Sequence, residues 1–336
     1  MRQTKCLRLV STYLTTKMRS HTFIDSLGTA SIMAKILDGK ALAKEIKDEL
    51  KIQIENWTKH GHRAPSLSCI IVGDDPASHT YVRNKIQAAK DVGIDAKTLL
   101  YEETLSEVEL IEKIKALNDD ANIDGILIQL PLPESISERN VCNAVAPEKD
   151  VDGFHIINVG QLSLDMPTIV PATALAVIEM LKRFKVPTFG RNAVVVGRSK
   201  NVGMPIAMML HSDMKHDSGL GMDATVTICH RYTPKEKLEY FCRNADIIIS
   251  ATGVAKLIKA DMVKPGATVI DVGITRITDD NGKTKLVGDV DYDEVSKIAG
   301  AITPVPGGVG PMTVAMLMQN TFQAAQKLRD IDSQMQ

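Results

Sequence analysis

The chain has 336 residues, of which 44% are hydrophobic and 24% charged, and its formal net charge is -1. This length exceeds what one hydrophobic core usually serves and predicts two domains, while the near-neutral charge argues against a nucleic-acid-binding protein. No apolar run approaches the ~18 residues of a membrane span, and the five cysteines form no C-x-x-C pair. Neither a transmembrane segment, a zinc site nor a disulfide framework is therefore indicated.

Residues 1–24 differ in composition from the rest of the chain. They hold five Lys and Arg residues and several hydroxyl residues, and the first acidic residue is Asp25. This composition is typical of a mitochondrial transit peptide, and the apolar run 7–10 is too short for a secretory signal. We therefore expect residues 1–32 to be a transit peptide, with a disordered basic tail as the alternative.

From Met33 onward, helical and strand patterns alternate. Apolar residues recur at helical spacing from Leu42 to Trp57, and Gly61 ends this predicted helix. The elements predicted next are strand 67–72, helix 78–92, strand 94–100, helix 106–117 and strand 123–129. Ser106 and Glu109 have the spacing of a capping box. Strands that alternate with helices predict a parallel sheet.

A second alternating series begins at Asn192. It comprises strand 192–196, a helix from Gly203, strand 224–229, a helix from Pro234, strands 246–250 and 268–272, and a final helix 312–328. The predicted fold class is α/β, with two α/β domains around a cleft, the second a Rossmann-type nucleotide-binding domain. We expect the first domain to comprise residues 33–177 and 308–336, and the second to comprise residues 178–307.

Two glycines six residues apart follow the strand 192–196. Gly197 closes the strand and Gly203 opens the helix, so that amides at the helix start point at an anion such as a phosphate. The spacing differs from the usual G-x-G-x-x-G pattern, and any strand-to-helix turn favours glycine, so the motif alone is moderately specific. Segments 251–253 and 271–274 add glycine turns at the sheet edge where nucleotides bind.

The end of the strand 224–229 bears on the choice of cofactor. NAD-binding folds usually place there an acidic residue that binds the ribose 2′-hydroxyl, whereas this chain has His230 and Arg231. Together with Arg198 they form a basic cluster that would attract the 2′-phosphate of NADP or a free phosphate ion beside NAD. Asp223, just before the strand, would hold a cation near such a phosphate. The alternative is that Arg231 is a solvated surface charge.

Tyr81 and Lys85 stand four residues apart on a predicted helix and therefore project from one face. Gln129 ends a predicted strand, and Asp152 lies in a later loop. A lysine, a glutamine and an aspartate at the carboxyl ends of strands form a polar group on an apolar lining, as binding sites require. Read separately they are a surface lysine, a strand-end cap and a turn residue; read together they favour a site.

The segment 303–313 is rich in proline and glycine. Proline fixes φ and glycine permits positive φ, so the backbone here is irregular and can approach a flat ligand closely. The alternative is a stiff turn before the last helix. Together with the motifs upstream, the segment favours a binding loop.

Five blocks of the sequence resemble the signature blocks of the bifunctional methylenetetrahydrofolate dehydrogenase/cyclohydrolase family. These blocks are residues 81–85, 125–133, 147–153, 197–203 and 303–313. The resemblance covers residues 36 to 328, and five blocks in the right order are far more specific than a single motif. The segments 201–207 and 230–234 resemble the mitochondrial NAD-dependent branch of that family.

The resemblance implies oxidation of 5,10-methylenetetrahydrofolate to the methenyl form with NAD or NADP, and hydrolysis of the methenyl form to 10-formyltetrahydrofolate, in mitochondrial one-carbon metabolism. The oxidation needs orientation of folate and nicotinamide more than a general base, because loss of hydride leaves a cation stabilised by two nitrogens. The hydrolysis needs proton transfers, which a lysine can perform where its surroundings favour the neutral amine.

The resemblance also implies roles for single residues. It assigns catalysis to Lys85, with Gln129 orienting the lysine, Asp152 binding the pterin ring and Tyr81 stacking on the folate. The implied substrate site comprises Tyr81, Val82, Arg83, Asn84, Lys85, Ile128, Gln129, Leu130, Pro306, Gly307, Gly308, Val309 and Gly310. The implied cofactor site comprises Gly197, Arg198, Ser199, Arg231 and Ile274.

The mitochondrial branch is similar in requiring Mg²⁺ and inorganic phosphate with NAD. The matching positions are Asp165 and Asp223 for the metal and Arg198 and Arg231 for the phosphate. A bound phosphate would occupy the charges otherwise left for the 2′-phosphate of NADP, so we expect use of both NAD and NADP. The resemblance further implies a homodimer in the mitochondrial matrix or at the inner membrane.

Other functions remain open. A monofunctional methylenetetrahydrofolate dehydrogenase is disfavoured by the presence of Lys85, and a catalytically silent nucleotide-binding protein would not need Lys85, Gln129 and Asp152. A common hydroxy-acid dehydrogenase is disfavoured because the first domain lacks a recognisable catalytic His and Arg pair. The loop 211–222 is longer than a tight turn, which leaves the position of Asp223 open.

Overall fold

The structure of the protein, a computed structural model, describes residues 33–215, 219–278 and 284–334. The expected transit peptide, residues 1–32, lies outside the described residues. The first elements are β1 (Lys35–Ile36), α2 (Gly39–Lys59), β2 (Ser66–Val72), α3 (Pro76–Val92), β3 (Asp95–Tyr101), α4 (Glu107–Asp119), β4 (Gly125–Ile128), α5 (Glu138–Ala144), α6 (Ile156–Ser163) and α7 (Ala172–Arg183). They are followed by β5 (Asn192–Val196), α8 (Gly203–His211), β6 (Thr225–Cys229), α9 (Lys235–Arg243), β7 (Ile247–Ser250), η1 (Ala260–Met262), β8 (Thr268–Asp271), β9 (Thr275–Thr278), β10 (Thr284–Val287), α10 (Tyr292–Val295), β11 (Ala301–Ile302) and α11 (Val309–Gln334).

The first sheet contains three parallel strands in the order β3-β2-β4. Helix α3 connects β2 to β3 and α4 connects β3 to β4, so the predicted alternation is confirmed. The capping box at the start of α4 is present as well, since Ser106 and Glu109 each bond the backbone of the other. The carboxyl ends of the three strands therefore lie at one edge of the sheet.

Helix α3 begins at Pro76, two residues before the predicted start. Asp75 caps it by accepting hydrogen bonds from the amides of Ala77 and Ser78, and proline suits the first helical position because it lacks an amide hydrogen. The helix ends at Gly93, which has the left-handed conformation common after helices.

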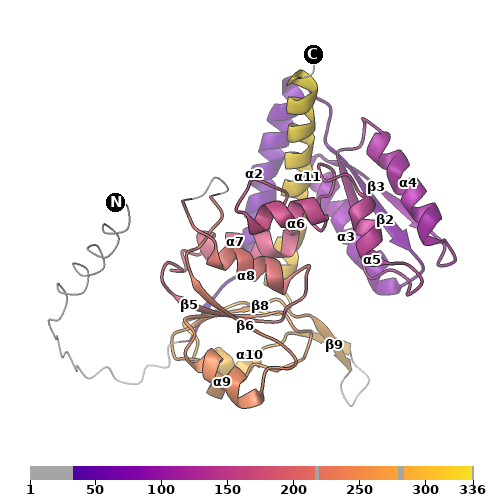
Figure 1. Cartoon of the computed structure of the whole chain (residues 1–336). Helices are drawn as coiled ribbons and strands as arrows, with labels where there is room; N and C mark the ends of the chain where they lie inside the picture. Colours follow the sequence, from indigo (N-terminus) through magenta and orange to yellow (C-terminus); the bar gives the residue numbers. More distant parts are fainter. Residues whose placement is uncertain (1–32, 216–218, 279–283, 335–336) are drawn as a thin grey trace, which may run out of the picture. The chain divides into compact units, whose positions relative to one another are not determined.

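The second sheet contains six parallel strands in the order β1-β11-β8-β7-β5-β6. Alternate residues of its central strands point to different hydrophobic clusters. Val195 of β5 is in the cluster of Ile206 of α8, whereas Val194 is in the cluster of Cys242 of α9 and Val295 of α10. Figure 1 shows α8 on one side of this sheet and α9 and α10 on the other. The sheet is covered on both faces, as predicted for a Rossmann-type domain.

Strand β1 corrects one expected boundary. We expected the first domain to begin at Met33, but Lys35 pairs in parallel with Ala301 and Ile36 with Ile302, which places β1 at the edge of the second sheet. A two-residue strand has no periodicity of its own. Its position depends on the contact with β11, which sequence patterns do not record.

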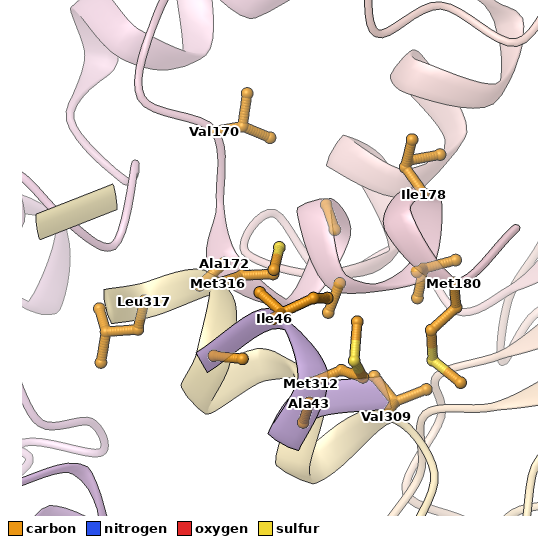
Figure 2. Packing of buried hydrophobic residues seen from close by; sticks show 14 of the residues in the cluster. Ala43, Ile46, Val170, Ala172, Ile178, Met180, Val309, Met312, Met316 and Leu317 are labelled. Atoms are coloured by element: carbon orange, nitrogen blue, oxygen red, sulfur yellow. The ribbon is translucent and has the colours of Figure 1, made fainter. Parts of the chain in front are cut away.

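Helix α11 packs against α2, α3 and α7. Figure 2 shows Met312 and Met316 of α11 near Ile46 of α2 and Ala172 of α7, all within one buried cluster. Methionine suits such a junction because its flexible side chain fills irregular gaps. Within the described part of the chain, none of the helices combines the length and the apolar character that a membrane crossing requires.

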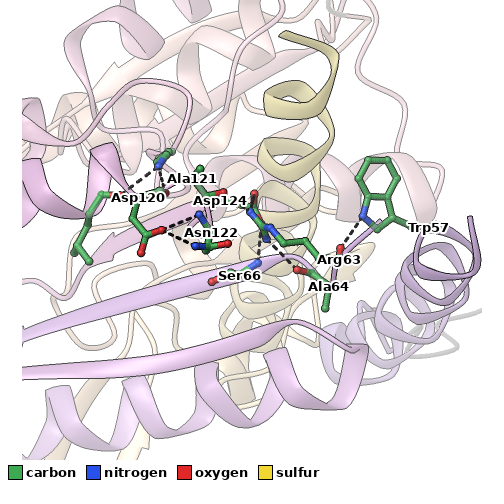
Figure 3. A network of polar contacts seen from close by, with 10 residues as sticks. Trp57, Arg63, Ala64, Ser66, Asp120, Ala121, Asn122 and Asp124 are labelled. Atoms are coloured by element: carbon green, nitrogen blue, oxygen red, sulfur yellow. Dashed lines mark hydrogen bonds and ion pairs between the residues drawn. The ribbon is translucent and has the colours of Figure 1, made fainter. Parts of the chain in front are cut away.

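Charged side chains close the amino edge of the first sheet. Arg63, before β2, forms a bidentate ion pair with Asp124, before β4, at 2.6 and 2.7 Å. Figure 3 shows this pair beside Ser66, whose amide also donates to Asp124. Removing Arg63 would leave the carboxylate of Asp124 buried without its partner, because Asp124 is 1% exposed.

Lys149 has a structural role on the same edge. Its Nζ donates to the carbonyl oxygens of Leu117, Asn118 and Asp120 at the end of α4, where the hydrogen bonds within the helix run out. Burial lowers the pKa of Lys149, and the nearby carboxylates oppose the shift. Although Lys149 belongs to the block 147–153, it stabilises a helix end.

Candidate active site

Lys85 and Gln129 meet at the carboxyl edge of the first sheet. Lys85 is half-buried on α3, and its Nζ donates to Oε1 of Gln129 at 3.0 Å. Gln129 directly follows β4, and its Nε2 donates to the carbonyl oxygen of Leu130 at 2.6 Å. Because the amide nitrogen is anchored to the backbone, the amide oxygen is held towards the lysine.

Asp152 is the third member of this group. The pKa of Asp152 is raised to about 6. Burial is the main cause, the positive charge of Lys85 opposes it, and the charge of Asp150 adds to it. Among the described residues, no hydrogen bond or ion pair joins Asp152 to Lys85, so the lysine acts on the carboxyl group through its charge alone. A carboxyl group with this pKa changes charge close to neutral pH.

Asp150 holds the loop that carries Asp152. It is 4% exposed, and its Oδ2 accepts hydrogen bonds from the amide of His155 at 2.7 Å and from Nδ2 of Asn158 at 2.9 Å. Burial raises the pKa of Asp150, and these hydrogen bonds oppose the shift. Asp150 is therefore occupied with backbone and amide donors.

Three residues of the predicted substrate site have their side chains in the hydrophobic core. Val82, Ile128 and Val309 are 1%, 5% and 4% exposed and belong to buried clusters. The prediction is corrected for these side chains, because neighbouring residues of a helix or strand point in different directions. Tyr81, by contrast, is 45% exposed on the helix face of Lys85.

The loop from Pro306 to Gly310 lies against both halves of the molecule. The carbonyl oxygen of Gly307 accepts a hydrogen bond from the amide of Lys40 at 2.9 Å, next to the start of α2. A Cβ atom placed on Gly310 would lie 3.5 Å from Cδ1 of Ile274. The predicted folate loop therefore lies next to Ile274, which was predicted for the cofactor site.

The glycine turn after β5 has the predicted close packing. Gly197 has a φ of 123°, and a Cβ atom at this position would collide with the carbonyl group of Ala251 at the end of β7. A Cβ atom on Gly203 would in turn collide with the carbonyl group of Gly197. Only glycine fits at both positions, so the turn leaves its backbone open at the start of α8.

The predicted basic cluster lies at the carboxyl edge of the second sheet. Arg198 follows β5, and its guanidinium carbon lies 5.9 Å from the ring centre of Tyr232, which is adjacent to Arg231 after β6. Arg198, Arg231 and Tyr232 are exposed. Two guanidinium groups on neighbouring strand ends, with no ion pair to either among the described residues, suit an anion.

A hollow of about 340 Å³ lies between the segment that follows β4 and the glycine turn that follows β5. Its lining combines the segment after β4 and helix α5 with the turn after β5, and comprises Leu130, Glu138, Arg139, Cys142, Ser199, Lys200 and Asn201. Residues predicted for substrate, Leu130, and for cofactor, Ser199, therefore share one cavity. The predicted cleft between the α/β domains corresponds to this arrangement.

Two family models match the chain. The catalytic domain of tetrahydrofolate dehydrogenase/cyclohydrolase matches residues 37–152, and the NAD(P)-binding domain of the same family matches residues 171–329. The chain belongs to the tetrahydrofolate dehydrogenase/cyclohydrolase family. The family inferred from the five sequence blocks is thereby confirmed, and with it the class of bifunctional enzymes with an NAD(P)-binding domain.

Relatives within the tetrahydrofolate dehydrogenase/cyclohydrolase family match nearly the whole described chain. The human "Bifunctional methylenetetrahydrofolate dehydrogenase/cyclohydrolase 2, mitochondrial" is 59% identical over 296 residues, which cover 88% of this chain and 85% of the relative. The structure of a 5,10-methylenetetrahydrofolate dehydrogenase from the silkworm Bombyx mori has 72% identity and a TM-score of 0.85, covering 89% of this chain and 100% of that one. A Trypanosoma brucei dehydrogenase-cyclohydrolase complexed with NADP and an inhibitor has 38% identity and a TM-score of 0.81, covering 88% and 98%.

The metal site expected from the mitochondrial branch of this family is not assembled within one chain. The carbonyl oxygen of Asp223 accepts from the amide of Gly190 before β5, whereas Arg231 follows β6. The five residues of β6 alone span roughly 17 Å, which is more than an aspartate and an arginine side chain bridge together. The expectation that Asp223 lies near the arginines is therefore wrong for a single chain.

Asp165 does not complete that site either. It follows α6 with a φ of 56°, and no hydrogen bond or ion pair among the described residues links it to Asp223, Arg198 or Arg231. Nor do three or more His, Cys, Asp or Glu side chains within the described ranges come together as metal ligands. The residues of one chain therefore do not fit a Mg²⁺ ion beside the arginines.

Two buried residues near the predicted catalytic residues were not recognised from the sequence. Nδ2 of Asn320, on α11, donates to the carbonyl oxygens of Val151 and Val170, which fixes the backbone beside Asp152. Cys69 of β2 lies near Lys85 and Asp152, and burial raises the pKa of its thiol to about 12. The contact of Asn320 with Val151 joins residues 169 positions apart and therefore leaves no local pattern in the sequence. Cys69 is a single cysteine in an apolar strand, so its sequence context is that of any core residue.

Proposed function

We propose that the two reactions of this enzyme, oxidation of 5,10-methylenetetrahydrofolate and hydrolysis of the methenyl form, use one site between Lys85 and the glycine turn at Gly197. The observation that supports this most is the hydrogen bond from Lys85 to Gln129, with Asp152 beside it. Structural lysines pair with carboxylates or cap helices, as Lys149 does, whereas Lys85 has an uncharged partner that leaves its remaining protons and charge available.

In the oxidation, the protein's task is orientation. Tyr81 offers an exposed ring on the face of α3 that carries Lys85, and Asp152 offers acceptor oxygens to the N–H groups of a pterin ring. The open backbone at Gly197 and Ser199 suits the pyrophosphate of the dinucleotide, whose nicotinamide accepts the hydride when bound. No residue needs to remove a proton in this step.

In the hydrolysis, Lys85 moves the protons. Its neutral amine accepts a proton from the water that adds to the methenyl carbon, and the resulting ammonium gives that proton to the ring nitrogen as the carbon–nitrogen bond opens. The proton that remains on the added hydroxyl leaves to solvent as the formyl C=O bond forms. Gln129 accepts a hydrogen bond in either protonation state and keeps Nζ in place.

The pH dependence of substrate binding tests the role of Asp152. Its pKa of about 6 means that the carboxyl group is ionised above this pH and protonated below it. Because the ionised form only accepts hydrogen bonds, we expect the KM for folate to rise as the pH falls below about 6. In Asp152→Asn this rise should disappear, and KM at pH 7.5 should be higher. Initial rates from pH 5 to 8 measure this, and an unchanged profile in the variant would exclude the proposed role.

We further propose that Arg198 and Arg231 bind inorganic phosphate when the cofactor is NAD and the 2′-phosphate when it is NADP. Their exposure and the lack of acidic partners among the described residues support this. In Arg231→Ala we expect phosphate to lose its activation of the NAD reaction, and the KM for NADP to rise by one to two orders of magnitude, since a charged hydrogen bond contributes ~1.5–3 kcal/mol. The exposed Lys235→Ala on α9 is the control. Equal effects of the two variants would count against the phosphate site.

The remaining features of the mitochondrial branch are proposals for this chain too. The human relative's name places that protein in mitochondria, and we propose the same compartment here, in the matrix or at the inner membrane. We propose a homodimer, Mg²⁺ as an activator of the NAD reaction, and domain limits as in the sequence analysis except for β1. Import of the full chain into isolated mitochondria, compared with a chain lacking residues 1–32, tests the location.

The whole proposal is tested by initial rates of NADH and NADPH formation from 5,10-methylenetetrahydrofolate, with and without phosphate and Mg²⁺. Turnover with both cofactors and phosphate activation with NAD alone are expected. Turnover without activation would retain the enzyme and remove the phosphate site, and no turnover would favour a silent nucleotide-binding protein.

A further inference from the structure

Two buried aspartates at the carboxyl edge of the second sheet take no part in the hydride and proton transfers. Asp271 ends β8, Asp289 lies in the loop between β10 and α10, and they are 3% and 0% exposed. Burial raises the pKa of Asp271 to about 7, because a charge is poorly solvated at this place. Buried acids are costly, and such acids beside a binding site indicate a function that offsets their cost.

Asp289 holds the end of β7. Its Oδ2 accepts three hydrogen bonds, from Oγ of Ser250 at 2.9 Å and from the amide and Oγ1 of Thr252 at 2.6 and 2.8 Å. Thr252 directly follows Ala251, whose carbonyl group packs against Gly197 of the glycine turn. The carboxylate therefore fixes the segment against which the glycine turn rests.

The other oxygen of Asp289 touches a different segment. Oδ1 is buried and has no hydrogen-bond partner among the described residues. A Cβ atom on Gly273 would collide with Oδ1, so the carboxylate lies directly against the Cα atom of this glycine. A buried acceptor without a donor is unfavourable, and the three hydrogen bonds to Oδ2 hold it in this position.

Asp271 binds the same glycine. Its Oδ1 accepts hydrogen bonds from the amides of Gly273 and Asp289, both at 3.0 Å, and its Oδ2 accepts from the amide of Val290 at 2.8 Å. The amide of Asp271 donates to Oγ1 of Thr303, the residue that follows β11, at 2.8 Å. The two aspartates thus connect the carboxyl ends of β7, β8 and β11.

The segment that the aspartates hold carries the contact between the two predicted ligand sites. Ile274 follows Gly273 and was predicted for the cofactor site, and a Cβ atom on Gly310 of the predicted folate loop would lie 3.5 Å from its Cδ1. A shift of Gly273 therefore moves Ile274 relative to the folate loop. Hydride transfer needs its two carbons to approach within ~3–3.5 Å, whereas hydrolysis needs no nicotinamide.

We propose that Asp271 and Asp289 are positioning residues for hydride transfer, which fix the segment 272–274 and with it the distance between the nicotinamide and the folate. The inference rests on the proposed function, in which both ligands meet between Lys85 and the glycine turn. The aspartates are buried and act through Gly273, and the proton transfers of hydrolysis belong to Lys85 in the first domain. Loss of either carboxylate therefore slows the oxidation and spares the hydrolysis.

The variant Asp289→Asn tests the proposal with almost no change of volume. If the amide oxygen keeps the bonds to Ser250 and Thr252, a buried NH₂ group presses against Gly273, and in the opposite orientation the acceptor of three hydrogen bonds is lost. We expect the kcat of the oxidation to fall by about 10²-fold, as for a misplacement of roughly 1 Å. Hydrolysis of the methenyl form by the same preparation should stay close to the wild-type rate.

A kinetic isotope effect identifies the step that is slowed. 5,10-methylenetetrahydrofolate deuterated at the methylene carbon slows only the step in which this carbon–hydrogen bond breaks. If Asp289→Asn slows hydride transfer, its isotope effect on the oxidation is at least as large as that of the wild type. A slow oxidation with a smaller isotope effect would mean that cofactor binding or release is impaired, and would overturn the proposal. An equal fall of both reactions would show a role in stability alone and overturn it too.

Gly273→Ala tests the same contact from its other member and removes no hydrogen-bonding group. Its Cβ atom would collide with the carboxylate of Asp289, so the oxidation should fall and the hydrolysis should be retained, as in Asp289→Asn. The matched control is Asp291→Asn, two residues further along the chain, which loses an ion pair with Lys256. It should leave both rates unchanged.

The two variants also separate this inference from the proposed function. If Asp289→Asn loses both reactions by unfolding, Gly273→Ala decides, and a wild-type oxidation rate in Gly273→Ala overturns the positioning role. The same result in both variants, with a wild type active in both reactions, overturns only this inference. A wild type that forms neither NADH nor NADPH would show that the proposed function is wrong, and the inference falls with it.

Discussion

Replacing Lys85 with alanine should lower the rate of methenyl hydrolysis by about 10²–10⁴-fold while the oxidation falls far less. The difference arises because hydrolysis needs two proton transfers and hydride transfer needs none. Lys85 donates to Gln129 at 3.0 Å, which holds its amine in one position, and its charge acts on Asp152. Both rates are measured on the same preparation, with methenyltetrahydrofolate and with methylenetetrahydrofolate and NAD.

The matched control is Lys90→Ala, an exposed lysine of the same helix. It should leave both rates close to those of the wild type and shows whether loss of a lysine from α3 alone perturbs the site. An equal fall of oxidation and hydrolysis in Lys85→Ala would mean that the lysine serves binding only. An unchanged hydrolysis rate would favour the monofunctional dehydrogenase.

Replacing Gly197 with alanine should abolish productive binding of NAD and NADP. A side chain at positive φ costs ~1–2 kcal/mol, and here the new Cβ atom would also collide with the carbonyl group of Ala251. The turn has to move away from β7, and with it the amides that receive the dinucleotide. Each ~1.4 kcal/mol of binding free energy that is lost in this way weakens the affinity for the cofactor tenfold. Fluorescence titration with the reduced cofactors NADH and NADPH measures the effect.

Gly190→Ala controls for the conformational cost alone. Gly190 also has a positive φ of 66°, but a Cβ atom there meets no atom within 4 Å. The control should lose a little thermal stability and keep its cofactor affinity. If Gly197→Ala binds NAD and NADP as the control does, the turn after β5 is not the dinucleotide site. Methenyl hydrolysis, which needs no nicotinamide, reports whether Gly197→Ala is still folded.

The meeting of Lys85 and Gln129 was predictable from the sequence because each residue obeys a local rule. Tyr81 and Lys85 share a helix face through their spacing of four, and Gln129 follows directly after an apolar strand. The carboxyl ends of parallel strands meet at one edge, so the two segments had to come together. The glycine turn was predictable for the same reason, since a buried strand followed by Gly197 and a helix leaves few other geometries.

The errors follow from contacts that have no local signal. Strand β1 is two residues long and is defined only by its pairing with β11. Val82 and Val309 stand inside blocks that resemble the family's signatures, but helix geometry turns their side chains into the core. Asp223 and Arg231 are close in sequence and distant in space, because an extended strand separates them. Eight residues rise only ~12 Å along a helix, whereas they span more than twice that distance along an extended strand.

The measurement that tests the shared site most directly follows three species in one reaction of the purified protein with 5,10-methylenetetrahydrofolate and NAD: NADH, the methenyl intermediate and 10-formyltetrahydrofolate. We expect 10-formyltetrahydrofolate to appear in step with NADH, faster than the methenyl form hydrolyses without protein, and this coupling to be lost in Lys85→Ala. Accumulation of the methenyl form in an amount equal to NADH in the wild type would contradict a site that performs both reactions.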